Sequence, residues 1–403
     1  MVCSDSADVS HRRMRQSLAT KLAGRFIPCP QKGRLIVGLP NGDFIELNGT
    51  EPGPEAKVDF HDWMALLRVA LNGDDGFVRG YIAGRIATTD VVAALDLAAC
   101  NEGAIKPFTR GLFSNSLVER VGHALRANTR AGSRRNIRAH YDLGNNFFRL
   151  WLDSALNYSS ALYLHDESLE EAQKRKIDRV LDLLALQNGD RLLEIGCGWG
   201  AFAERALQNH DVDFAGITLS AEQLTYARSR LQTEIDKGKC KLRLQDYRDL
   251  AGCFDKITSI EMVEAVGEHY WPQYFQKLRC CLAEGGRAVI QAITIEENRF
   301  STYRRRPDFI QRYIFPGGML PTHRIILEHA NRVGLKLLHH ESFGDSYART
   351  LRAWRNRFTA AADELEKLGF DERFQRLWEY YFAYCEVGFL RSSINVGLYA
   401  FCT

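Results

Sequence analysis

A glycine-rich turn between an apolar segment and a helix constrains this chain more than any other feature. The run LLEIGCGWGAF, residues 192–202, places Gly196, Gly198 and Gly200 directly after a hydrophobic stretch. Glycines at this spacing let the backbone adopt left-handed conformations and approach a ligand closely. The run also opens a series of strand–helix repeats, which predicts a mostly parallel sheet with helices on both faces.

The periodicity of apolar residues predicts the elements of this α/β fold. The expected strands are 190–196, 212–219, 240–245, 254–262, 286–294, 334–342 and 395–401. The expected helices are 168–187, 200–209, 220–236, 272–284 and 322–333, with two long helices before the final strand. Residues 295–321 interrupt this alternation with aromatic and basic side chains, so we expect an irregular cover insertion there.

The chain of 403 residues is long enough for more than one domain. A hairpin over 33–49 and helices over 61–71 and 88–101 predict a small α+β domain in the N-terminal part. The expected segments are a basic mobile N-terminus (1–24), the small α+β domain (25–105), a helical basic linker (106–140) and the α/β domain (141–403).

Composition excludes several classes of protein. The net charge of +3 does not indicate a nucleic-acid partner, and no run is apolar enough for a membrane span. The ten cysteines form no C-x-x-C pair and no H-E-x-x-H motif occurs, so we expect no metal site. The N-terminus lacks an apolar secretory segment, and we expect free thiols in a reducing cytoplasm.

The glycine run satisfies the spacing of the dinucleotide fingerprint, but its neighbours argue against a dinucleotide. Glu194 precedes the glycines, where an acid would repel a pyrophosphate yet could hold a cationic amino group. The second strand ends at Thr218 instead of at the acid that binds ribose hydroxyls. Asp246 follows the third strand and can accept from an adenine amino group. This pattern favours S-adenosylmethionine and a seven-strand-type methyltransferase; the alternative is a tight turn without a ligand.

Several segments resemble the cyclopropane-fatty-acyl-phospholipid synthase family, which includes mycolic acid cyclopropane synthase-like methyltransferases. They are HYDLGNNFFRLWLDSALNYSSALY (140–163), LLEIGCGWGAFAERA (192–206), GITLSAEQL (216–224), QDYRDL (245–250), EMVEAVGEHYW (261–271), YIFPGGMLP (313–321), TLRAWRNRF (350–358) and WEYYFAYCEVGF (378–389). The resemblance covers about 140–403 and implies a Rossmann-like class I S-adenosylmethionine-dependent methyltransferase domain. The domain at 25–105 is similar, more weakly, to the family's N-terminal lipid-binding domain.

The resemblance implies methyl transfer from S-adenosylmethionine to the cis double bond of an unsaturated phospholipid acyl chain. The resulting carbocation loses a proton from the new methyl group and closes a cyclopropane ring. The aromatic residues of 378–389 fit an apolar channel whose ring faces stabilise that cation. In the family a bound bicarbonate removes the proton, and its holders match Ser160, Glu264, Gln291, Tyr347 and the backbone of Ile293.

The residues expected to bind the cofactor follow from the motifs and the resemblance together. They are Tyr158, Ser159, Glu194, Gly196, Cys197, Gly198, Trp199, Gly200, Thr218, Leu219, Ser220, Gln223, Gln245, Asp246 and Tyr247. Helix capping alone is an alternative explanation for Ser220, which stands at the start of a helix.

Two of the expected bicarbonate holders depart from the bacterial pattern of the family. Ser160 stands where many members have cysteine, and Gln291 stands where many have histidine, as in plant-type members. Both side chains can hydrogen-bond an oxyanion. The product therefore stays open, because related proteins end in a methylene- or methyl-branched chain or methylate another lipid. A non-catalytic lipid-binding protein with a vestigial cofactor fold is the alternative from a different class.

The segment SIEMVEAVGEHYW, residues 259–271, carries two glutamates after a buried strand. We expect Glu264 to orient the small oxyanion base, and Glu261 to be a structural acid near the methionine moiety. Cys385 aligns with a cysteine that is sometimes assigned as catalytic in the family. Because a thiol among aromatic rings is also an ordinary packed group, both roles of Cys385 stay open.

The basic residues of 106–140 are either a solvated connector or a patch for anionic headgroups. With a phospholipid as substrate, we expect a cytoplasmic enzyme that docks transiently, as a peripheral protein, at the inner face of the membrane. A homodimer is left open.

Overall fold

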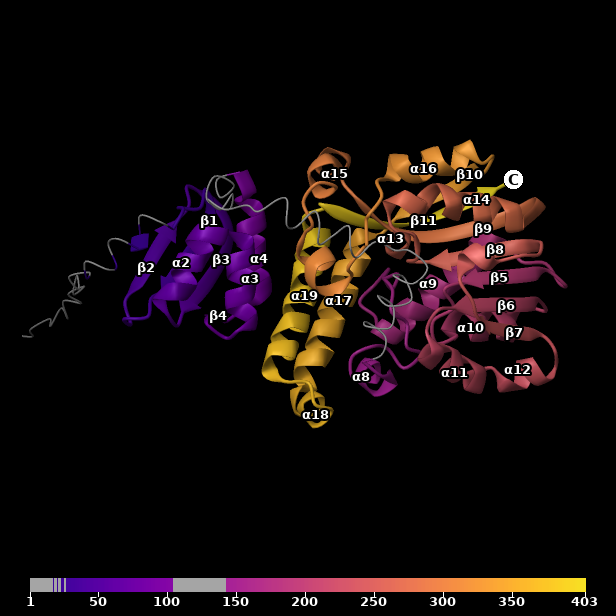
Figure 1. Ribbon diagram of the computed structural model, residues 1–403, viewed down its shortest axis with the longest axis horizontal. Helices are drawn as coiled ribbons and strands as arrows, with labels where there is room; N and C mark the ends of the chain where they lie inside the picture. Colours follow the sequence, from indigo (N-terminus) through magenta and orange to yellow (C-terminus); the bar gives the residue numbers. More distant parts are fainter. Residues whose placement is uncertain (1–16, 18–19, 21–22, 25–26, 104–142) are drawn as a thin grey trace, which may run out of the picture. The chain divides into compact units, whose positions relative to one another are not determined.

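The computed structural model describes residues 17, 20, 23–24, 27–103 and 143–403 (Figure 1). The chain divides into two compact units, Met1–Ser114 and Asn115–Thr403. Most of the N-terminus expected over 1–24 and all of the linker expected over 106–140 lie outside the described residues. The predicted boundaries of these two segments therefore stay predictions.

The first unit contains a four-stranded sheet in the order β2-β1-β3-β4. Its elements are β1 (Lys32–Gly38), β2 (Phe44–Asn48), β3 (Glu51–Phe60), α2 (Trp63–Asn72), α3 (Asp74–Ile82), β4 (Ile86–Thr88) and α4 (Val91–Cys100). The predicted hairpin is confirmed, because β1 and β2 pair in antiparallel fashion. Both predicted helices are confirmed as α2 and α4, which Asp62 and Asp90 cap at their N-termini.

The sequence did not predict β3, which runs parallel to β1 in the interior of this sheet. Pro52, Gly53 and Pro54 disfavour a strand, because proline lacks the N–H that a ladder needs. The structure accommodates them at an irregularity in the β1–β3 register, and β4 pairs only with the far end of β3, Val58–Phe60. The prolines therefore lie where one side of β3 has no ladder partner.

The second unit contains a seven-stranded sheet in the order β10-β11-β9-β8-β5-β6-β7 (Figure 1). Its strands are β5 (Arg191–Ile195), β6 (Asp213–Thr218), β7 (Cys240–Leu244), β8 (Phe254–Ile260), β9 (Leu282–Ile295), β10 (Lys336–Ser342) and β11 (Ile394–Cys402). Neighbouring strands are parallel except at β11, which is antiparallel to β9 and β10. This arrangement confirms the predicted mostly parallel α/β sheet.

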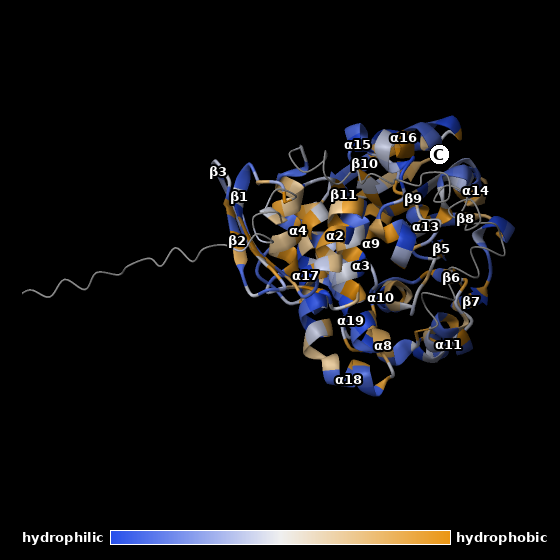
Figure 2. Ribbon diagram, turned by 60° about the vertical axis from the view of Figure 1, so that its left-hand side comes forward, coloured by the Kyte–Doolittle hydropathy of each residue, from blue (hydrophilic) through white to orange (hydrophobic). Residues whose placement is uncertain are grey.

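The helices of this unit follow the predicted order. They are α8 (Asn145–Arg149), α9 (Leu169–Leu184), α10 (Ala201–Asn209), α11 (Ala221–Arg230), α12 (Gln232–Asp236), α13 (Val263–Val266), α14 (Trp271–Cys281), α15 (Glu297–Tyr303), α16 (His323–Arg332), α17 (Gly344–Ala360), α18 (Ala362–Lys367) and α19 (Glu372–Leu390). Orange and blue segments alternate on α11, α14 and α16 in Figure 2, as expected for amphipathic helices.

Four details differ from the prediction. The helix expected over 220–236 is split between α11 and α12, and β9 begins at Leu282, earlier than expected. The insertion expected to be irregular contains the short helix α15 and a π-helical turn, Ile310–Ile314. The short helices α8 and α13 were not predicted, since each is too brief to show a clear apolar period.

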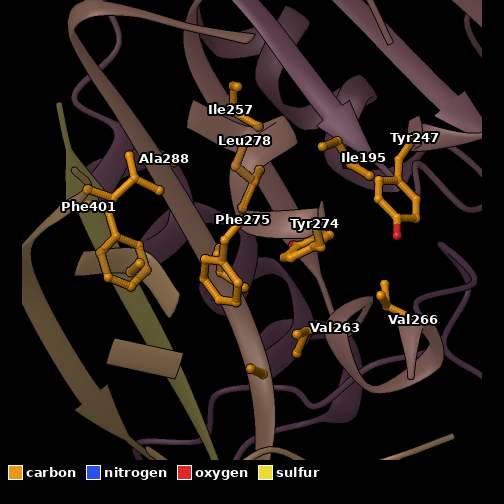
Figure 3. Packing of buried hydrophobic residues seen from close by; sticks show 14 of the residues in the cluster. Ile195, Tyr247, Ile257, Val263, Val266, Tyr274, Phe275, Leu278, Ala288 and Phe401 are labelled. Atoms are coloured by element: carbon orange, nitrogen blue, oxygen red, sulfur yellow. The ribbon is translucent and has the colours of Figure 1, made fainter. Parts of the chain in front are cut away.

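One buried hydrophobic cluster packs β8 and the following helix α13 against β9 and α14. Ile257 of β8 and Ala288 of β9 are fully buried and belong to one cluster with Phe275 and Leu278 of α14 (Figure 3). Burying one such large side chain contributes about 1.5–3 kcal/mol. Val263 of α13 belongs to the same cluster, so the turn between β8 and α13 is held against the core.

The two long helices α17 and α19 lie side by side (Figure 1). Glu386 of α19 is fully buried and accepts hydrogen bonds from Arg352 and Arg355 of α17. Tyr347 of α17 stacks on Phe389 of α19, with ring centroids 4.5 Å apart. This helix pair therefore holds the Tyr347 ring in a defined orientation.

Candidate active site

A cavity opens at the carboxyl ends of β5, β6 and β8, the edge at which open α/β sheets bind ligands. Expected cofactor residues that line it are Tyr158, Ser159, Glu194, Gly196, Cys197, Gly198, Trp199, Thr218, Leu219, Gln223, Gln245 and Tyr247. Gly200, Ser220 and Asp246 do not line it. Residues that sequence reasoning did not assign to the cofactor include Asn157, Lys176, Glu261, Met262 and Ala265.

The glycine loop follows β5 and turns sharply into α10. Gly196 has φ +89°, and the backbone N–H groups of Gly196 and Cys197 both donate to Ile217 O at 2.9 Å. A Cβ atom on Gly196 would lie 2.6 Å from Sδ of Met262, itself a lining residue. Gly200 serves packing instead, because a Cβ there would press on Ala227 at 3.2 Å.

Glu194 is a buried acid on the cavity wall. Among the described residues, its Oε2 atom has no hydrogen-bond partner. Burial raises the pKa of Glu194 to about 8, and the positive charge of Lys176 opposes that rise. An unpaired carboxylate oxygen at the end of the first strand fits a ligand that brings an ammonium or hydroxyl donor.

Lys176 of α9 supplies the buried positive charge of the cavity. Its Nζ donates to Ser159 Oγ at 2.8 Å, and burial lowers its pKa while Glu261, Asp153 and Glu194 raise it. One signal was available in the sequence. Gln173 and Lys176 fall on the face of α9 that buries Ile177, and such polar positions within an apolar face indicate buried partners.

The other expected cofactor residues divide into lining and supporting positions. Thr218 Oγ1 donates to Gln223 Oε1 at 2.9 Å, and both residues line the cavity. Ser220 caps α11 by accepting from the Gln223 N–H, which favours the capping explanation. The buried Asp246 carboxylate accepts from Arg248 at 2.8 and 2.6 Å, so its contact with adenine stays a prediction.

Glu261 lies at the centre of a hydrogen-bond cluster on the cavity wall. Its Oε1 accepts from the Ser160 N–H and from Gln291 Nε2, both at 2.8 Å. Its Oε2 accepts from the Tyr347 hydroxyl at 2.7 Å. Three of the residues expected to hold an oxyanion therefore converge on the carboxylate that we expected to be structural.

Glu264 lies next to this cluster but has different partners. Its Oε1 accepts a short hydrogen bond from the Ile293 N–H, and its Oε2 has no partner within the described part of the chain. Burial, reinforced by the negative charge of Glu261, raises the pKa of Glu264 to about 8. These surroundings favour the protonated form of Glu264, and its expected role as the clamp of an oxyanion stays a prediction.

Aromatic rings surround Tyr158, which lines the cavity. The Tyr158 hydroxyl lies 3.1 Å from that of Tyr381, and the Tyr158 ring lies 5.3 Å from Trp151 and 5.5 Å from Trp354. Their π faces suit a developing positive charge. Cys385 does not line the cavity, and burial raises the pKa of its thiol, which favours the packed alternative over a reactive thiolate.

Two kinds of feature are missing from the described ranges 27–103 and 143–403. No group of three or more His, Cys, Asp and Glu side chains there could hold a metal ion. No helix in those ranges is both long and apolar enough to cross a membrane.

The seven-stranded sheet, the glycine loop after β5 and the acid that precedes it define a class I S-adenosylmethionine-dependent methyltransferase. The family model described as mycolic acid cyclopropane synthetase matches residues 128–398. The chain belongs to this family of cyclopropane synthases.

Relatives and solved structures agree with this assignment. The chain is 38% identical over 349 residues to tuberculostearic acid methyltransferase UfaA1 of Mycobacterium tuberculosis (82% of this chain, 79% of the relative). It is 36% identical over 257 residues to the cyclopropane-fatty-acyl-phospholipid synthase of Escherichia coli K12 (64% and 65%). The structure of mycolic acid cyclopropane synthase CmaA1 complexed with SAH and CTAB superposes with a TM-score of 0.63 at 30% identity, over 67% of this chain and 98% of that one.

Proposed function

We propose that this methyltransferase adds the methyl carbon of S-adenosylmethionine to the cis double bond of an unsaturated phospholipid acyl chain, producing a cyclopropane. The observation that carries the proposal is the pairing of a methyl-donor cavity with a buried carboxylate cluster and aromatic rings on its wall. An alkene is a weak nucleophile, so the reaction needs close approach in a water-poor site. The cation that follows needs aromatic faces and a base.

The chain's own residues have distinct tasks in this scheme. When bound, S-adenosylmethionine supplies an electrophilic methyl group on a sulfonium. The free Oε2 of Glu194 would accept a hydrogen bond from the ammonium group or the ribose hydroxyls of the cofactor. The glycine loop would let the protein backbone approach the cofactor closely. Tyr158 stands on the wall that faces the acyl chain in this proposal, beside Trp151 and Trp354.

A second product is supported by a specific finding. The relative that covers 82% of this chain is named a tuberculostearic acid methyltransferase, and the family resemblance includes enzymes that end in a methylene or methyl branch. The same methyl transfer leads to a cyclopropane or to a methylene branch, because these two differ only in the bond that forms after the cation arises; a saturated methyl branch additionally requires a hydride donor that reduces the methylene group. We therefore retain a methylene- or methyl-branched acyl chain as the alternative.

Incubating the purified protein with S-adenosylmethionine and vesicles of an unsaturated phospholipid tests this function directly. We expect mass spectrometry to show a gain of one CH2 unit per modified chain. Proton NMR then distinguishes the products, since ring methylene protons resonate at high field and vinylidene protons in the alkene region. If calorimetry shows that the cofactor binds but mass spectrometry finds no modified lipid, the proposal is contradicted and methylation of another substrate is favoured.

We further propose that the first unit contacts the lipid surface at the inner face of the membrane. Trp63, Met64 and Leu67 share one face of α2 and are 41%, 50% and 48% exposed. Exposed apolar side chains of this size are candidates for insertion between headgroups. The double substitution Trp63→Ser and Leu67→Ser should reduce the fraction of protein that sediments with vesicles, without changing cofactor affinity. An unchanged fraction would contradict this membrane-contact surface.

A homodimer stays an open prediction. Analytical ultracentrifugation of the protein without lipid would test it.

A further inference from the structure

Donors from three distant segments converge on both oxygens of a single carboxylate. Ser160 precedes α9, Gln291 lies on β9 and Tyr347 lies on α17, yet all three donate to Glu261 at 2.7–2.8 Å. Hydrogen bonds to a charged acceptor are the strong ones, and several of them define a binding site for an oxyanion. The Glu261 side chain thus occupies the oxyanion site that these donors form.

The backbone at Glu261 points to a use for this side chain. Its φ of +50° lies in the left-handed region, which a glycine adopts freely and a glutamate does not. The conformation is held by a hydrogen bond from the Glu261 N–H to Gln291 O at 2.8 Å. Unfavourable backbone conformations that persist in a well-packed fold gather at functional sites.

Several groups oppose protonation of the Glu261 carboxyl. Burial raises the pKa of Glu261 overall, and the three donors and the positive charge of Lys176 lower it in part. Its neighbour Glu264 has fewer donors, and its pKa is raised to about 8. Of these two acids, Glu261 therefore has more donors that stabilise a carboxylate, and it alone lines the cavity.

We propose that Glu261 is the general base of the reaction, so that this enzyme needs no bound bicarbonate. This inference depends on the proposed function. The alkene π pair forms a C–C bond to the methyl carbon while the C–S bond breaks, leaving a neutral thioether and a carbocation on the acyl chain. A C–H bond of the new methyl group then breaks, its electron pair closes the ring, and its proton passes to the Glu261 carboxylate.

The same base serves the alternative product. If hydride migration along the acyl chain precedes deprotonation, the electron pair of the methyl C–H bond forms a C=CH2 group instead of a ring. The proton again passes to Glu261, and it is released to solvent after the product leaves. No oxidant or reductant is consumed in either case.

Two substitutions at Glu261 test this assignment. Glu261→Gln keeps the shape but removes the base, so we expect turnover to fall at least ~100-fold, the usual contribution of a general base. Glu261→Gly suits the positive φ and opens space among the three donors. We expect added bicarbonate or formate to restore turnover of the glycine variant at least ~10-fold, since a small oxyanion can occupy the donor cluster.

Binding measurements separate this role from a structural one. Calorimetry should show bicarbonate binding by the Glu261→Gly variant and none by the wild-type protein. Affinity for S-adenosylmethionine and the melting temperature report whether each variant is folded. Glu268→Gln is the matched control, because Glu268 pairs with Arg304 at 2.8 Å and does not line the cavity. We expect its turnover to equal that of the wild type.

The outcomes distinguish an error in the assignment of the base from an error in the proposed function. Full wild-type turnover in buffer purged of carbon dioxide, together with rescue of the glycine variant, supports Glu261. Wild-type turnover that depends on bicarbonate, or an active Glu261→Gln variant, overturns this assignment while leaving the proposed function intact. Failure of the wild type to modify lipid with or without bicarbonate overturns both.

Discussion

The two ends of the cavity are constructed in different ways. At one end, a continuous run from Glu194 to Trp199 supplies the glycine loop and its acid. At the other end, the cluster around Glu261 takes its donors from Ser160, Gln291 and Tyr347, which lie far apart in the chain. The first end is therefore a local motif, whereas the second exists only once β9 has paired with β8 and α17 has brought Tyr347 to the turn after β8.

This difference determines how each end responds to mutation. The glycine loop depends on backbone conformation, so a single methyl group changes the space available to the cofactor. The carboxylate cluster depends on several donors to one acceptor, so removal of one donor weakens it by a limited amount. Three substitutions test this contrast, in order of decreasing expected effect.

The substitution Gly196→Ala should have the largest effect. The new Cβ would displace the Met262 side chain, and a φ of +89° is unfavourable for alanine. We expect the affinity for S-adenosylmethionine to fall on the order of 100-fold, about 3 kcal/mol, as measured by calorimetry. Gly189→Ala is the control, since Gly189 has φ +83° with nothing near its Cβ and does not line the cavity. Equal losses of affinity in both variants would contradict the local explanation.

The substitution Tyr347→Phe should have an intermediate effect at the other end. It removes one hydrogen bond to a charged carboxylate, worth about 1.5–3 kcal/mol, so we expect turnover to fall ~10- to 100-fold. Affinity for the cofactor should stay within about 2-fold, because the glycine loop is untouched. Steady-state kinetics and calorimetry together measure this separation.

The control for that experiment is Tyr384→Phe on α19. The Tyr384 hydroxyl donates to Asp308 and not to Glu261, and Tyr384 does not line the cavity. Its turnover should stay close to that of the wild type. A parallel loss of turnover and cofactor affinity in Tyr347→Phe would show that the two ends are not independent.

The smallest effect concerns pH and stability at Glu264. The folded protein retains a proton on Glu264 up to about pH 8, whereas an unfolded chain releases it at the usual glutamate pKa near ~4.3. Between these values the folded state binds more protons, so the free energy of unfolding falls as pH rises, by at most about 1.4 kcal/mol per pH unit. Glu264→Gln carries no such proton, so denaturant titrations should favour this variant progressively as pH increases.

The wild-type protein and the Glu264→Gln variant share the ionisable groups that surround Glu264. They are Glu261, Tyr274, Tyr303 and Tyr399, and taking the difference between variant and wild type reduces their contribution. A stability difference that does not change with pH would show that Glu264 is ionised in the folded protein. That result would also restore Glu264 as a candidate for the charged partner of an oxyanion.

Much of the fold could be predicted from the sequence, because strands β5 to β9 have apolar runs separated by amphipathic helices. The strand β3 could not be predicted, since its prolines and glycine contradict strand propensity, and its conformation at these residues is decided by the β1 ladder. The position of Lys176 within the site was missed for a similar reason. A buried lysine appears in a sequence only as a charged residue on an apolar helical face.

The sequence by itself determined the class of fold and the location of the cofactor loop, because both depend on residues adjacent in the chain. A family resemblance also predicted Ser160, Gln291 and Tyr347 as site residues. Only the tertiary structure decided that these three donors converge on Glu261 and leave Glu264 with a single donor. The physical reason is that which of two nearby carboxylates is ionised depends on its burial and its donors, and packing between distant segments sets both.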